Sequence, residues 1–131
     1  MSTNNINTRE EQHGNVSFAN DVVATIAGLA TVEIEGVAGM SGGFSGGLAE
    51  LLGRKNLTKG VKVEVGKEEC AIDLYVVVDY GSDIPAMCKK IQANVKKAVE
   101  TMTGLRVIET NVHIQGVHID KEKKEEDKRV H

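Results

Sequence analysis

The chain has 131 residues and a formal net charge of −3, so it is the size of one ordinary domain and has no overall positive charge to favour nucleic-acid binding. Aromatic residues make up only 3% and Trp is absent, which disfavours modules that stack several exposed rings on bases or sugars. A multidomain enzyme is therefore not expected, and the core must be built from Val, Ile, Leu and Ala.

Polar segments at both ends frame one folding unit. Residues 1–15 are rich in Asn, Thr and charge without hydrophobic periodicity, which predicts a disordered N-terminal tail. Residues 120–131 mix acidic and basic side chains and predict a charged, flexible C-terminal tail. Residues 16–119 are predicted to form a single domain. Two cysteines without a partner motif, and no signal peptide or apolar run of about 18 residues, predict a reduced cytoplasmic chain.

The first half of the domain combines a helix with short strands. Apolar side chains recur at intervals of three and four over residues 20–34, which predicts a helix with one buried face. Short strands are expected before it, at residues 16–18, and after it, at residues 37–40. Residues 42–47 hold four glycines and predict a loop. Alternating valines over residues 61–65 predict the next strand.

The second half holds the longest predicted elements. Residues 70–80 alternate between an apolar face and a second face that is only half polar, which predicts a central strand. A helix is expected from the cap at Ser82 or Asp83 to Gly104, with Pro85 in its first turn. One face of this helix is predicted to be apolar through Ile84, Cys88, Ile91, Val95, Ala98 and Met102.

A final strand is predicted over residues 105–119, with a bulge or bend after Val107 and another at Gly116, where the apolar phase shifts. The resulting order is β-α-β-β-β-α-β. We therefore predict an α+β fold, a two-layer sandwich with a mostly antiparallel sheet and two main helices on one face.

Four lysines of the second helix share its polar side, opposite the apolar face. A cationic stripe of this kind suits anionic lipid, nucleic-acid phosphate or an acidic protein. It is more often a solvated helix face, and Glu100 in the same sector dilutes its charge. These candidate partner-binding residues are Lys89, Lys90, Lys96 and Lys97.

The glycine loop is the second candidate contact surface. A surface loop of this kind can present its Phe44, Ser45 and Gly46 to a partner, although a plain flexible connection is the more usual role of such a loop. The Lys-Ser/Thr pair of a phosphate-binding loop is missing, because Leu48 and Ala49 follow the last glycine. A nucleotide site is therefore disfavoured, and no cofactor is predicted.

Other polar residues do not form a predicted catalytic or metal site. His113 and His118 with Asp120 lack metal-ligand spacing. Asp73 and Asp79 are about 20 Å apart on an extended strand, too far for paired acid and base catalysis. No catalytic residues are predicted, and an enzyme acting on small phosphorylated or acyl substrates stays a weak alternative.

Four long stretches of the core resemble the alkaline shock protein family, the envelope and general stress proteins of mostly Gram-positive bacteria. They are IAGLATVEIEGVAGMSGG (residues 26–43), GRKNLTKGVKVEV (53–65), AIDLYVVVDYGSDIP (71–85) and VETMTGLRVIETNVHIQGV (99–117). The resemblance implies a non-enzymatic, cytoplasmic protein that acts in cell-envelope homeostasis. It further implies gathering at the inner face of the membrane through a membrane-anchored protein partner, and self-association.

We therefore expect a scaffold or adaptor in the envelope stress response that uses a protein surface, with no small-molecule substrate. The alternative is a small nucleic-acid-binding module that uses the basic face of the second helix. This alternative lacks a stacking platform and a basic GXXG clamp, so nucleic acid is not the expected partner.

Overall fold

The sheet is organised around strand β3 (Glu69–Asp79). In the computed structural model, which describes residues 13–42 and 54–119, one edge of β3 pairs antiparallel with two strands in succession. These are β2 (Val61–Val65) along its first half and β1 (Val37–Met40) along its end. The other edge pairs parallel with β4 (Arg106–His118). The last pairing is parallel because a helix crosses over between β3 and β4.

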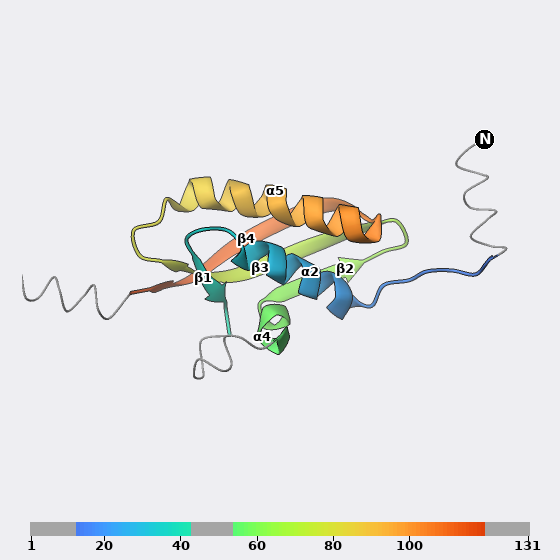
Figure 1. Ribbon diagram of the computed structural model, residues 1–131, viewed down its shortest axis with the longest axis horizontal. Helices are drawn as coiled ribbons and strands as arrows, with labels where there is room; N and C mark the ends of the chain where they lie inside the picture. The colour runs from blue at the N-terminus through green and yellow to red at the C-terminus, as the bar shows by residue number, and fades with distance from the viewer. Residues whose placement is uncertain (1–12, 43–53, 120–131) are drawn as a thin grey trace, which may run out of the picture.

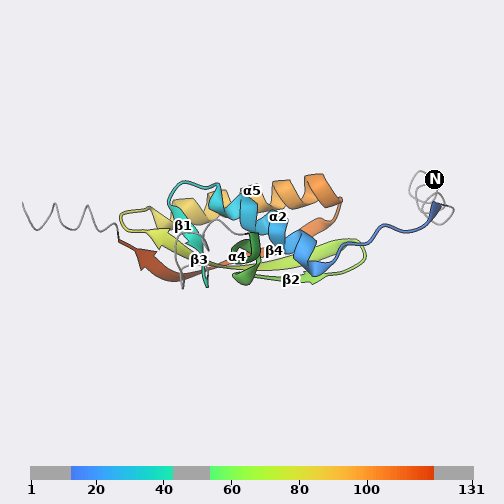
Figure 2. The ribbon, with the colours of Figure 1, turned by 60° about the horizontal axis from the view of Figure 1, so that its bottom comes forward.

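Two helices, α2 (Asn20–Val32) and α5 (Ile84–Thr103), lie together on one face of this sheet (Figures 1 and 2). The short helix α4 (Arg54–Lys59) packs at the side of α2. Alternate β3 side chains point into the helix layer and form the centre of the core: Cys70, Ile72, Leu74, Val76 and Val78. The predicted two-layer α+β fold, with two main helices on one face, is confirmed.

Helix α5 begins and ends where the sequence predicts. The Asp83 carboxylate accepts a hydrogen bond from the main-chain N–H of Ala86 at 3.2 Å, and Pro85 occupies the first turn. Gly104 ends the helix with φ of 78°, in the left-handed region that glycine adopts without strain. Its N–H donates to the carbonyl of Glu100.

Both irregularities predicted for the last strand are confirmed. The β3–β4 register skips Ile108 and again skips Gln115, so β4 carries a bulge at each place. Each bulge reverses the parity of the side chains that follow. As a result, Val112 faces the helix layer like Val107, while His113 and His118 both lie on the open face of the sheet.

Several predictions need correction. Residues 16–18 form no strand, so the described order begins with α2, and the segment before β2 folds as α4. The apolar face of α5 is displaced: Met102 is 69% exposed because it lies in the last turn, whereas Met87 and Val99 are buried. Residues 1–12 and 120–131 lie outside the described residues, so the two predicted tails stay predictions.

Candidate partner-binding surface

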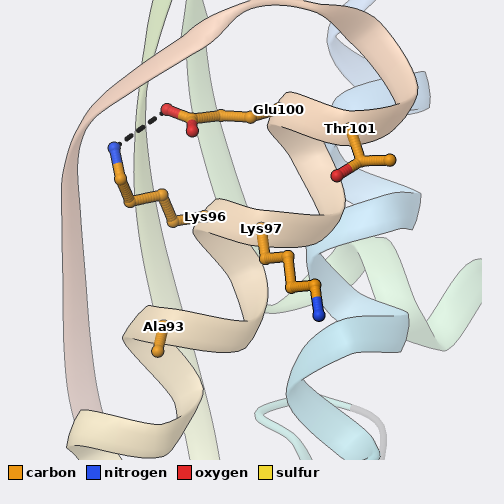
Figure 3. A pocket seen from close by; sticks show the side chains of 5 residues that line it. All are labelled: Ala93, Lys96, Lys97, Glu100 and Thr101. Atoms are coloured by element: carbon orange, nitrogen blue, oxygen red, sulfur yellow. Dashed lines mark hydrogen bonds and ion pairs between the residues drawn. The ribbon is translucent and has the colours of Figure 1, made fainter.

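The outer face of α5 carries the four lysines singled out from the sequence, and all four are exposed. We call Lys89, Lys90, Lys96 and Lys97 the lysine face. The lysine face has two flanks, one toward β4 and one toward α2. Lys96 points toward β4, whereas Lys97 points toward α2 (Figure 3). A shallow surface hollow between them is lined by Ala93, Lys96, Lys97, Glu100 and Thr101.

On the first flank, α5 side chains bond the main chain of β4. The Glu100 carboxylate accepts from Lys96 Nζ at 2.9 Å and from the N–H of Val107 at 2.9 Å. Lys96 Nζ also donates to the carbonyl of Val107 at 3.4 Å, and Gln92 donates to the carbonyl of Thr110 at 3.0 Å. Hydrogen bonding to Lys96 and to the Val107 N–H holds the pKa of Glu100 below its ordinary value.

On the second flank, α5 is fastened to α2. The side-chain amide of Asn94 donates to the carbonyl of Ala30 at 2.8 Å and to the Glu33 carboxylate at 3.0 Å. These contacts set α5 and α2 side by side over the sheet. Lys97 is exposed on this flank and has no ion pair among the described residues.

The second predicted contact surface lies outside the described residues. Phe44, Ser45 and Gly46 fall in the gap between residues 42 and 54. Their role in partner binding stays a prediction.

A polar cluster on the open face of the sheet was not predicted. Asp73 Oδ1 lies 3.1 Å from His113 Nε2 and accepts from the Asn111 amide at 3.1 Å. The rings of Tyr75 and His113 stack at 4.5 Å between centroids, and Lys62 Nζ lies 5.4 Å from the Tyr75 centroid. The hydrogen bonds from His113 and then Asn111 lower the pKa of Asp73.

The sequence contained a weak signal for this cluster. Asp73 and Tyr75 share strand parity, and so do Asn111 and His113. What the sequence did not provide is the β3–β4 register, which sets Asp73 opposite Asn111 and Tyr75 opposite His113.

The histidines considered as metal ligands are each paired with a different aspartate. His113 contacts Asp73, and His118 Nδ1 lies 3.5 Å from Asp79 Oδ1. Within residues 13–42 and 54–119 there is no group of three side chains placed to hold a metal ion. Asp120, the third candidate, lies outside these ranges.

The two cysteines lack the surroundings of a reactive thiol. Cys70 is buried under the helix layer and Cys88 is half-buried on α5. Burial raises the pKa of both thiols, whereas a nucleophilic cysteine needs a lowered one.

A comparison with known protein families shows which family the chain belongs to. Residues 8–119 match the alkaline shock protein 23 family, described as having a cell envelope-related function. The chain belongs to this family. The resemblance inferred from the sequence is thereby confirmed.

Relatives of this alkaline shock protein family member support the same assignment. This chain is 40% identical over 112 residues to the uncharacterized protein YqhY of Bacillus subtilis, and the match covers 85% of this chain and 83% of YqhY. It is 34% identical over 110 residues to YloU of the same species, covering 82% and 92%. A stress response regulator gls24 homolog of Streptococcus pyogenes is 36% identical over 102 residues, which are 77% of this chain and 57% of that relative.

Among solved structures, a MamM-CTD variant is similar to this family member with a TM-score of 0.47 and 15% identity, over 73% of this chain and 95% of that chain. A likeness at this level does not bear on function.

The family to which the chain belongs is connected with the stress response and the cell envelope. The family is described by these roles rather than by an enzymatic activity. None of the helices in the described part of the chain is long and apolar enough to cross a membrane.

Proposed function

We propose that the protein is a non-enzymatic scaffold or adaptor in the envelope stress response and in envelope homeostasis. In this proposal it gathers at the inner face of the cell membrane by binding a membrane-anchored protein partner. The lysine face of α5 is the docking surface. The single observation that carries the proposal is the exposure of all four lysines on one helix, in a family with a cell envelope-related function.

Three of the four lysines keep their charge available for a partner. Lys96 is bonded to Glu100, whereas Lys89, Lys90 and Lys97 have no ion pair among the described residues. Cations grouped on one face attract an acidic surface and steer its approach. Binding is therefore expected to weaken as the salt concentration rises.

Reversing the lysines in pairs tests the proposal. The pairs are Lys89→Glu with Lys96→Glu, and Lys90→Glu with Lys97→Glu. The control is Lys59→Glu with Lys67→Glu, two exposed lysines that are not part of α5. Recovery of the protein in the membrane fraction is expected to fall at least about tenfold with both pairs together and to stay unchanged in the control. Unchanged recovery with all four lysines reversed would show that the lysine face is not the docking surface.

The nucleic-acid alternative uses the same lysines but gains no support from the sheet. The facing rings of Tyr75 and His113 stack on each other, and Lys62 lies over the Tyr75 ring, so these ring faces are not available to bases. Retention on RNA that declines steeply with salt, equally lost in the lysine reversals, would favour the alternative instead.

Self-association is a further part of the proposal. A scaffold that collects at a membrane gains binding strength when several copies act together. Sedimentation at increasing protein concentration is expected to show species larger than one chain. A single monomeric species across the range would contradict this part and leave partner docking standing.

A further inference from the structure

The outer edge of β4 is half closed by α5. Strand β4 pairs with β3 alone in the described part of the chain, so its other edge carries main-chain groups without a strand partner. Alternate residues direct their N–H and C=O groups to this edge. Both groups of Val107 and the carbonyl of Thr110 point outward, because side chains of α5 bond them there.

The closed part of the edge covers the start of β4. Glu100 accepts the N–H of Val107, Lys96 donates to the carbonyl of Val107, and Gln92 donates to the carbonyl of Thr110. Gln92, Lys96 and Glu100 are spaced four apart and lie on one side of α5. These side chains occupy the hydrogen-bonding positions that an added strand would need.

The open part of the edge comes next along β4, after Thr110. Every second residue directs its main-chain groups outward, so Val112 and Ile114 are the next outward residues before the bulge at Gln115. Within the described ranges no side chain bonds the main chain of Val112 or Ile114. This stretch is regular, because its pairing with β3 shows no register shift between Glu109 and Ile114.

A lysine lies above this open stretch. Helix α5 runs antiparallel to β4 (Figure 1), and Lys89 precedes Gln92 by three residues on the same side of the helix. It is therefore displaced by about 4.5 Å from Gln92 toward the later residues of β4. Val112 lies about 6.6 Å beyond Thr110 along the strand, so Lys89 stands close to its level.

We propose that the edge of β4 at Val112 and Ile114 accepts an extended, acidic segment of a partner protein as an added strand. The main chain of β4 supplies the hydrogen bonds, and Lys89 attracts acidic side chains on the helix side of the segment. This inference deepens the proposed function and rests on it, because it assigns the docking element next to the lysine face.

A second copy of this chain fits the edge less well. Pairing two β4 edges about a two-fold axis would bring two α5 helices together across the seam. Lys89 of each copy would then lie near Lys89 of the other, because both are close to the level of Val112, and like charges so placed repel. An acidic segment meets Lys89 with favourable charge.

The test uses the full chain extended at its C terminus by a Gly-Ser linker and a segment of alternating Val and Glu. A matched chain carries alternating Val and Lys, and tethering gives both segments a high effective concentration at the edge. Amide hydrogen exchange of Val112 and Ile114 is the measurement. Exchange at both amides is expected to be at least about tenfold slower with the Val-Glu segment than with the Val-Lys segment.

A lysine outside the lysine face provides the control. Lys89→Glu is expected to abolish the slowing, whereas Lys59→Glu, the same charge reversal at an exposed residue of α4, is expected to leave it intact. Equal exchange with both segments, or equal loss in both variants, overturns the edge proposal. Membrane recovery that depends on the lysine face would then still support the proposed function, so the two failures are distinguishable.

Discussion

Glu100 of α5 accepts the main-chain N–H of Val107 at 2.9 Å and so fastens the end of the helix to the beginning of β4. The same carboxylate holds Lys96 at 2.9 Å. Glu100 thus has a structural role beside the lysine face, and Lys96, one of the four lysines, is bonded to it.

The contact between Glu100 and Val107 predicts a dependence of stability on acid. The pKa of Glu100 is lower in the folded chain, so its contribution is present above its unfolded pKa and is lost as pH falls through the folded value. Glu100→Gln is expected to flatten the loss of stability between about pH 5 and pH 3. Denaturant unfolding across this range measures the effect.

Glu64→Gln is the control for that series, because Glu64 is exposed on β2 and makes no ion pair among the described residues. It is expected to keep the acid profile of the unchanged protein. An identical profile for Glu100→Gln would show that the carboxylate does not fasten β4.

The polar cluster predicts a measurable change at Asp73. Its pKa is lowered chiefly by the hydrogen bond from His113 and less by that from Asn111. His113→Phe retains an aromatic ring beside Tyr75 and removes the hydrogen bond, so the pKa of Asp73 is expected to rise toward its ordinary value. An NMR titration of the Asp73 carboxyl carbon checks this, with Asn111→Ala giving a smaller rise. A smaller rise for His113→Phe than for Asn111→Ala would contradict the geometry.

The corrected core face of α5 predicts a contrast between two apolar residues. Ile91→Ala empties a fully buried site and is expected to cost about 2–5 kcal/mol of unfolding free energy. Met102→Ala removes a side chain that is 69% exposed and is expected to cost less than about 0.5 kcal/mol. Urea unfolding of both variants measures these free energies. Similar losses of unfolding free energy would show that Met102 packs in the core.

Gly28 predicts a reversal of the usual helix rule. Gly→Ala inside a helix ordinarily stabilises by about 1 kcal/mol, but a Cβ at Gly28 would lie 2.5 Å from the carbonyl oxygen of Leu57 in α4. Gly28→Ala is therefore expected to destabilise by roughly 1–3 kcal/mol in thermal or urea unfolding. Gly116→Ala is the control, because its Cβ would meet Val77 at an ordinary 3.9 Å. Stabilisation by Gly28→Ala would mean that α4 does not pack closely on α2.

The features that could be predicted from the sequence are local. Asp83, Pro85 and Gly104 mark the ends of α5 because caps and turns depend on neighbouring residues. The two bulges of β4 were visible as breaks in the apolar phase. The exposure of the lysine face followed from helical spacing alone.

The features that could not be predicted depend on distant parts of the chain. The parallel register that joins Asp73 to His113 is set by the α5 crossover. The contact of Glu100 with Val107 depends on where the last turn of α5 lies relative to the start of β4, which the sequence does not show. The exposure of Met102 depends on the position of the same turn. Periodicity identifies a face but does not say where along the element that face stops being covered.

In-cell crosslinking of the tagged protein, followed by detergent extraction of the membrane fraction and mass spectrometry, tests whether the lysine face binds a membrane-anchored partner. We expect one dominant small membrane protein, recovered with the unchanged chain and lost when the lysine face is reversed to Glu. Recovery only in the soluble fraction, together with RNA or ribosomal proteins, would contradict it.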